Sequence, residues 1–348
     1  MTTIVSSFPG RKIKVNGAKK LYFGGTAYLG LQTQPIFLKL YRANLKKYGS
    51  NYGASRKANI KIDIFDTAEN YLAKVVKSEA CITVSSGFLA AQLACNFFKS
   101  KGHTVFYAPN SHISLHHYNS KNSSSYSALS KALEKHLKAN SKPPVVCMDS
   151  LDFNGANYPN FMALQQLPLD KIILISDDSH AINLPLNNGG GCFSLLQQLR
   201  PKELVVCTSL GKGFAVQGGA LFGTKERMEQ LKNTAFYGGA SPASPANLGV
   251  LLAAEPIYKK RRERLAKHIV TFLANTKHLE HFSFTPNHPT FSFTNQKITQ
   301  YLEAHNILVT NFNYPNEDSP TMSRIVLSAH HKKKDIELVC KLINTLFK

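Results

Sequence analysis

The chain has 348 residues, of which 43% are hydrophobic and 18% are charged, and its formal net charge is +21. This length and composition are those of a folded protein with one large domain or two moderate ones. No stretch approaches the roughly 18 consecutive apolar residues of a membrane span, and the first residues lack the pattern of a signal peptide. We therefore expect no membrane partner.

The six cysteines are widely spaced, with no C-x-x-C pair, and we predict no metal site. Cys81, Cys147 and Cys207 fall inside expected strands, where a free thiol behaves as a small apolar residue. We therefore expect a reduced chain in the cytoplasm.

The large positive charge raises the question of nucleic-acid binding. The basic residues gather mainly at 259–262 and 332–334, and no stacking-aromatic motif, zinc knuckle or basic arm accompanies them. We therefore expect a basic, solvated surface that favours anionic ligands, and no nucleic-acid partner.

The first elements along the chain form a predicted hairpin, with strands at 13–15 and 21–23 on either side of Asn16-Gly17. A helix follows at 35–48. A second helix is predicted at 66–78, because Asp66 is a candidate N-cap and Glu69 stands at capping-box spacing from it.

The next part of the chain alternates strands with helices. We expect apolar strands at 81–84, 103–107, 145–148, 171–176, 204–207 and 219–222. The helices between and after them are expected at 87–99, 125–139, 161–166, 193–199 and 225–233. Near-continuous apolar strands separated by helices indicate an α/β domain with a mostly parallel sheet covered by helices.

The pattern changes after a proline-rich break at 241–245. A long helix is expected at about 246–276, followed by strands at 282–284, 291–293, 307–309 and 325–327 and helices at 297–305 and from 334 onward. This indicates a smaller α+β domain with an antiparallel sheet. We divide the chain into an N-terminal segment (1–47), a large domain (48–240) and a small C-terminal domain (241–348) that includes the long helix.

Ligands in open α/β sheets lie beyond the carboxyl ends of the strands, and three such ends here carry unusual chemistry. The first strand end runs into Ser85-Ser86-Gly87-Phe88 at a helix start. Backbone N–H groups and hydroxyls there could hold a phosphate, or the serine could be only a helix cap.

The second strand end is followed by Asp177-Asp178-Ser179-His180. Asp177 could point into the crevice and hold a buried cation, or the two carboxylates could belong to a solvated turn. The third end leads to Lys212, which stands between two glycines. An amine, a carboxylate and a phosphate cradle are together what pyridoxal phosphate (PLP) needs.

The segments SSGF, DDSHA and TSLGKG, in this order and spacing, resemble the fold-type I PLP-dependent enzymes. Among these they are most similar to the α-oxoamine synthase family, which includes glycine C-acetyltransferase and 8-amino-7-oxononanoate synthase. The run from Arg324 to His331 resembles the closing motif of that family. The resemblance implies a fold-type I PLP-dependent transferase fold and a homodimer. It also implies an acyltransferase that condenses an amino acid with an acyl-CoA thioester.

The resemblance also implies roles for individual residues. Lys212 would form the aldimine with the cofactor, Asp177 would pair with the pyridine nitrogen, and His180 would hydrogen-bond the ring hydroxyl. His112 matches the histidine that stacks on the cofactor ring, although it could be an ordinary polar residue at a helix start.

Further matches concern the cofactor phosphate and the substrate. The phosphate ligands implied by the resemblance are Ser86, Gly87, Phe88 and Ser209. Arg324 matches the arginine that grips the substrate carboxylate with its planar fork, and its other interpretation is a surface salt bridge.

Several positions depart from the family pattern. Ala27 replaces an asparagine that helps to bind the substrate carboxylate, and Asn183 and Leu186 replace two glycines. The segment 238–245 (GGASPASP) replaces a stretch that reaches the partner subunit's phosphate, where Ser241 or, in a shifted alignment, Gly238 would stand.

These departures spare the central cofactor contacts and leave the reaction open. An aminotransferase, or an aldolase or decarboxylase, would share Lys212, Asp177 and Arg324. A cofactor-binding scaffold without turnover is a further alternative.

Overall fold

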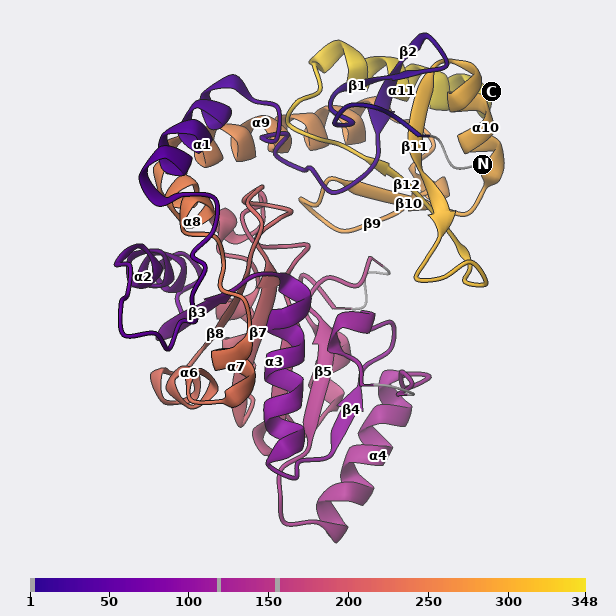
Figure 1. Cartoon of the computed structure of the whole chain (residues 1–348). Coiled ribbons are helices and arrows are strands. Elements are labelled where there is room, and N and C mark those ends of the chain that lie inside the picture. The colour runs from indigo at the N-terminus through magenta and orange to yellow at the C-terminus, as the bar shows by residue number, and fades with distance from the viewer. Residues whose placement is uncertain (1–3, 118–119, 154–156) are drawn as a thin grey trace. The chain divides into compact units, whose positions relative to one another are not determined.

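The computed structural model describes residues 4–117, 120–153 and 157–348, which form two compact units (Figure 1). The central unit is Lys39–Glu255. The terminal unit combines the chain up to Leu38 with Pro256–Lys348. The predicted large domain, 48–240, falls inside the central unit. Most of the N-terminal segment joins the C-terminal part of the chain, because a strand from each belongs to one sheet.

The central unit contains a six-stranded sheet with the order β3-β8-β7-β6-β5-β4. Its strands are β3 (Ala80–Val84), β4 (Val105–Tyr107), β5 (Val145–Asp149), β6 (Ile173–Asp177), β7 (Glu203–Ser209) and β8 (Gly219–Gly223). Strands β4 to β7 are parallel, and β8 runs antiparallel to both β3 and β7. Strand β3 therefore has the direction of β7, and the carboxyl ends of β3 to β7 lie at one edge. The predicted mostly parallel sheet is confirmed.

The helices of this part of the chain are α1 (Pro35–Tyr48), α2 (Ile64–Val76), α3 (Gly87–Ser100), α4 (Tyr126–Ala139), α5 (Phe193–Gln198), α6 (Lys225–Lys232), α7 (Ala235–Gly239) and α8 (Pro245–Ala253). Apolar residues of α3, among them Leu93 and Phe97, share one core with Val145 and Ile173 of the sheet. This burial on the sheet is the main source of stabilisation for an apolar helix face.

The terminal unit contains a second six-stranded sheet, with the order β1-β2-β11-β12-β10-β9. Its strands are β1 (Lys12–Val15), β2 (Ala18–Phe23), β9 (Ser283–Phe284), β10 (Thr290–Phe293), β11 (Ile307–Asn313) and β12 (Thr321–Val326). All pairs are antiparallel except β2 with β11. Its helices are α9 (Glu255–Asn275), α10 (Gln296–Ala304) and α11 (Lys333–Leu346). The predicted α+β character is confirmed.

The predicted N-terminal hairpin is also confirmed. Val15 pairs with Ala18 across the turn, and Asn16 and Gly17 both have positive φ, at 50° and 81°. Asparagine and glycine adopt this left-handed conformation at the lowest cost, which is why they mark two-residue hairpin turns.

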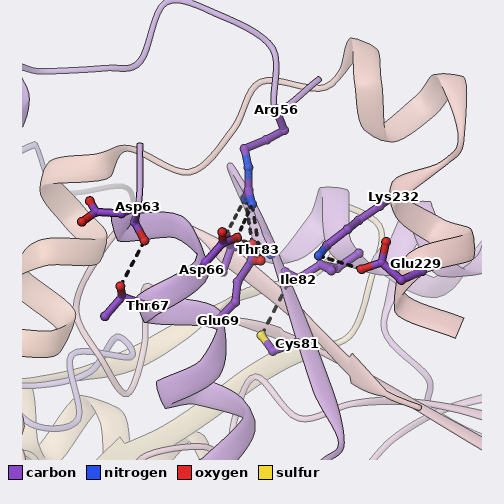
Figure 2. Close-up of polar contacts among 10 residues, drawn as sticks. All are labelled: Arg56, Asp63, Asp66, Thr67, Glu69, Cys81, Ile82, Thr83, Glu229 and Lys232. Atoms are coloured by element: carbon purple, nitrogen blue, oxygen red, sulfur yellow. Dashed lines mark hydrogen bonds and ion pairs between the residues drawn. The ribbon is translucent and has the colours of Figure 1, made fainter. Parts of the chain in front are cut away.

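The predicted capping box at Asp66 is wrong. Helix α2 begins at Ile64, and Asp66 lies in its first turn. The side chain of Glu69 is instead buried: its Oε1 accepts hydrogen bonds from Thr83 N at 2.9 Å and from Arg56 Nη1 at 2.7 Å (Figure 2). A buried carboxylate needs such partners, so Glu69 joins α2 to β3 rather than capping its own helix.

The predicted single helix at 246–276 is interrupted. The structure has two helices, α8 and α9, which meet at Ala254 and Glu255. Pro256 explains the break, because proline has no N–H to donate and is tolerated only in the first turn of a helix. Among the residues that the structure describes, no helix combines the length and apolar character needed to cross a lipid bilayer.

Candidate active site

Three strand ends predicted to share a ligand do lie together in the central unit. The N–H of Ser209, the last residue of β7, donates to Ser179 Oγ just beyond β6 at 2.8 Å. A Cβ atom built on Gly87, which follows β3, would lie 2.6 Å from Ser209 Cβ. Only glycine allows this close approach, so the contact with Ser209 on β7 requires a glycine at position 87.

Lys212 lies in the turn after β7, and its Nζ is 2.8 Å from His180 Nε2. The turn is tightly held, because a Cβ on Gly213 would lie 2.2 Å from the Ile182 carbonyl oxygen. Asn183 Nδ2 donates to the carbonyl of Gly213 at 3.1 Å. The φ of Asn183 is 57°, a left-handed conformation that explains why the family pattern has a glycine at this position. Asparagine can replace that glycine because it tolerates this conformation better than most residues.

Asp177 and Asp178 are both buried, with 8% and 1% of their surface exposed, so a solvated turn is wrong. Asp177 is the last residue of β6; its Oδ1 accepts from Ser179 N at 2.8 Å and its Oδ2 from Ser114 Oγ at 3.2 Å. Asp178 accepts from Ser150 Oγ at 2.5 Å and from the Cys192 N–H at 3.0 Å.

The two carboxylates therefore have different surroundings. Burial raises the pKa of Asp178 to about 6, against the effect of its two hydrogen-bond donors. Asp178 holds loops together, whereas Asp177 belongs to the same polar cluster as His112 and Ser114.

His112 stands at the start of the 3-10 turn Ile113–Leu115, as its alternative interpretation predicted. Its ring Nδ1 is 2.7 Å from Ser114 Oγ. Burial lowers the pKa of the imidazole, Asp177 opposes this effect, and Lys212 adds to it. His112 is therefore within electrostatic reach of both predicted catalytic groups.

Asp149 is a member of this cluster that the sequence interpretation missed. It is the last residue of β5 and the register partner of Asp177, and its Oδ2 accepts from the His112 N–H at 2.6 Å. Burial and the nearby charge of Asp177 raise the pKa of Asp149 well above its usual range. The sequence signal that could have identified Asp149 is its position, because it is a carboxylate at the carboxyl end of a strand.

The start of α3 is the place where the sequence predicts a phosphate cradle. Ser86 is the N-cap, and its Oγ accepts from Leu89 N at 3.1 Å, so its hydroxyl serves as a helix cap. The N–H groups of Gly87 and Phe88 belong to the first turn, where helix N–H groups lack intrahelical acceptors and favour anions. Ser209 lies against Gly87 and completes this side of the site.

Arg324 lies in the other unit, on β12, between its register partners Ser292 and Thr310. It is half-buried, and burial lowers the pKa of its guanidinium while Tyr28 and Tyr314 oppose that effect. The central unit thus brings together eight of the nine predicted site residues: Ser86, Gly87, Phe88, His112, Asp177, His180, Ser209 and Lys212.

This set of groups fits PLP. A lysine amine, a buried carboxylate, a histidine ring and a helix N-terminus stand at one sheet edge, and each matches one part of that molecule. The sequence pattern of the aminotransferase class I and II family matches residues 18–343. The chain belongs to the aminotransferase class I and II family.

Two relatives match nearly the whole chain. The 8-amino-7-oxononanoate synthase of Buchnera aphidicola is 25% identical over 357 residues, which are 97% of this chain and 91% of that protein. The 8-amino-7-oxononanoate synthase of Pseudomonas savastanoi is 25% identical over 362 residues, which are 99% of this chain and 91% of that protein.

Solved structures agree with the predicted fold. A serine palmitoyltransferase from S. paucimobilis with a bound PLP–myriocin aldimine has a TM-score of 0.81 and 17% identity, over 99% of this chain and 92% of that one. An 8-amino-7-oxononanoate synthase from Francisella tularensis has a TM-score of 0.68 and 18% identity, over 94% and 97%. The predicted fold-type I transferase fold and the resemblance to α-oxoamine synthases are confirmed.

Proposed function

We propose that the protein is a PLP-dependent α-oxoamine synthase that condenses an amino acid with an acyl-CoA thioester. The observation that carries this proposal is the convergence of Lys212, Asp177 and the start of α3 at one sheet edge. The 8-amino-7-oxononanoate synthases that match almost the full chain favour acyl transfer over amino transfer.

PLP, when bound, supplies an aldehyde that links to amines and a pyridine ring that withdraws electrons from the substrate. Lys212 is the amine for that link. Asp177 would hold the proton of the ring nitrogen, and Ser114 and Ser179 fix its two oxygens for this task. The amides of Gly87 and Phe88, with Ser209, would hold the phosphate.

The lysine also acts as the base. With PLP and an amino acid in the site, the Lys212 amine would be placed to take the proton from the substrate carbon that bears the amino group. His180 holds this amine at 2.8 Å and would donate to the ring hydroxyl in the complete site. Arg324 would bind the substrate carboxylate through its planar guanidinium.

We also propose a homodimer in the cytoplasm. All six cysteines are free and buried, as suits a reducing compartment. The segment 238–242, with Ser241, lines a surface hollow together with 51–55. Ser55 Oγ donates to the carbonyl of Gly238 at 2.6 Å and fixes one side of this hollow. A partner subunit would meet the chain there.

A substrate panel tests the reaction. Purified protein loaded with PLP is assayed with amino acids and acyl-CoA thioesters, and separately with amino acids and 2-oxo acids. Free thiol that is released from acyl-CoA only when an amino acid is present supports the synthase. Amino transfer to the oxo acid without thiol release would replace it with an aminotransferase.

A further inference from the structure

Three side chains in the connection between α9 and β9 bring metal-binding atoms together at the surface of the terminal unit. His278 Nδ1 lies 3.2 Å from Glu280 Oε1, and His281 Nε2 lies 3.9 Å from the same oxygen. Among the residues that the structure describes, no other group of three or more histidine, cysteine or acidic side chains brings its ligand atoms within 4.8 Å of one another. The sequence prediction of no metal site was based on the cysteines, and this cluster contains none.

The separations between these atoms suit one divalent ion of the zinc type. Zinc lies about 2.0–2.2 Å from imidazole nitrogen and carboxylate oxygen, so two ligands of a tetrahedral ion are about 3.4 Å apart. His278 and Glu280 are already near that separation. The side chain of His281 is 35% exposed, which leaves it room to turn and shorten its own two separations. Imidazole ligands favour zinc and similar transition metals over magnesium and calcium, which prefer oxygen ligands.

The backbone on both sides of the three ligands is held in place. Before them, the Lys277 N–H donates to Asn344 Oδ1 on α11 at 2.8 Å, and Asn344 Nδ2 donates to the Asn275 carbonyl at 2.8 Å. After them, Phe282 is buried and packs edge-on against Phe272. A segment that is fixed at both ends loses little conformational freedom when its side chains bind an ion.

Phe347, directly after α11, lies against both imidazoles. Its ring is stacked on that of His281, with centroids 3.8 Å apart, and its centroid is 5.5 Å from that of His278. Stacking uses the ring face of His281 and leaves the nitrogen atoms at the ring edge for ligands. Ion pairs alone are a weaker explanation of the cluster, because they need protonated histidines and stabilise little at an exposed carboxylate such as Glu280.

We propose that His278, Glu280 and His281 form a binding site for one zinc ion, with water as the remaining ligand. The imidazoles would bind as neutral donors, and the carboxylate would offset part of the charge of the ion. The bound ion would hold the connection between α9 and β9 in one conformation beside Phe347. The proposal does not depend on the proposed function, because Lys212 and Asp177 belong to the central unit.

The first test is a calorimetric titration of the full-length protein, freed of metal with a chelator, with zinc chloride. We expect one zinc ion per chain. His281→Phe keeps an aromatic ring for the stack on Phe347 but removes a ligand, and Glu280→Gln removes the charge with little change in shape. Each variant should bind zinc about tenfold more weakly or worse. Native affinity in both variants would overturn the proposal.

His305→Gln is the matched control. His305 is an exposed histidine of the same unit, after α10, and its Nδ1 contacts the Tyr301 carbonyl at 2.8 Å. We expect this variant to bind zinc like the native protein. A loss equal to that of His281→Phe would mean that surface histidines hold an adventitious ion only, and it would overturn the proposal.

The second test is X-ray absorption at the zinc edge, with one equivalent of zinc added to the native protein. We expect nitrogen and oxygen ligands at about 2.0–2.2 Å, two of them imidazoles, and no sulfur at about 2.3 Å. In His281→Phe one imidazole should remain. Sulfur ligands in the native protein would place the ion at the cysteines, and an unchanged number of imidazoles in His281→Phe would place it at other histidines. Either result would overturn the proposal.

Discussion

Two regions of the chain gather histidines that are partly or fully buried, and these histidines have different partners. In the central unit, His112 and His180 contact a serine hydroxyl and a lysine amine near a buried carboxylate. In the terminal unit, His331 Nδ1 accepts from the Ser328 N–H at 3.0 Å, and its Nε2 donates to the Tyr22 carbonyl at 2.9 Å. Side-chain partners that can gain or lose protons indicate a reactive site, whereas backbone partners fix one tautomer and indicate packing.

The largest effect in this comparison should come from the lysine of the central cluster. Lys212→Ala removes both the covalent link to PLP and the proposed base, so activity should fall by about 10³-fold or more, with loss of the visible band. Absorbance spectra and steady-state rates measure this. Lys202→Ala, between α5 and β7, should leave both unchanged. A visible band that persists in Lys212→Ala would mean that another lysine holds the cofactor.

The neighbouring carboxylates provide a sharper contrast within one unit. Asp177→Asn should weaken PLP binding and slow turnover by about 10²-fold with little change in the free energy of unfolding. Asp178→Ala removes the acceptor of the Cys192 N–H and one of the two acceptors of Ser150 Oγ, and it should lower the free energy of unfolding by about 1–3 kcal/mol. Urea unfolding and PLP titration separate the two effects. Equal losses in both measurements for both variants would contradict the division of roles.

The histidines of the terminal unit should make the free energy of unfolding depend on pH in acid. Burial lowers the pKa of His331 to about 4 and that of His330 to about 3, below the ordinary value of about 6.5. Between these pKa values the unfolded chain binds more protons than the folded one. The free energy of unfolding therefore has its full value above pH 6.5 and falls as the pH drops toward 4. We expect a loss of about 1–3 kcal/mol for His331 over this window.

Urea titrations from pH 7 to pH 4 measure that loss. His331→Gln should flatten the dependence, and His305→Gln, at an exposed position after α10, should not. If His331→Gln keeps the full acid sensitivity, the loss comes from other groups.

A smaller effect is expected at the turn that carries Lys212. Gly213→Ala would bring a methyl group to 2.2 Å from the Ile182 carbonyl oxygen, so the turn must shift, at a cost of about 1–3 kcal/mol. Gly239→Ala, where no atom lies within 4 Å of the new Cβ, is the control. Thermal unfolding of the two variants should differ, and equal midpoints would contradict the close packing of the turn.

The sequence predicted features that depend on local pattern. Lys212, Asp177 and Gly87 follow apolar strands, and the carboxyl ends of such strands share an edge in any parallel sheet. Ser114 and Asp149 were missed because their partners, Asp177 and the His112 N–H, depend on strand register and on a loop conformation. Glu69 was misread for the same reason, since Thr83 and Arg56, distant in sequence, competed with its own helix terminus.

Borohydride reduction of the PLP-loaded native protein tests the central claim most directly. The reduction makes the link between PLP and its lysine permanent, and peptide mass spectrometry then locates it. We predict one modified residue, Lys212, in the peptide that follows β7. Modification at another lysine, or none at all with PLP in excess, would contradict the account.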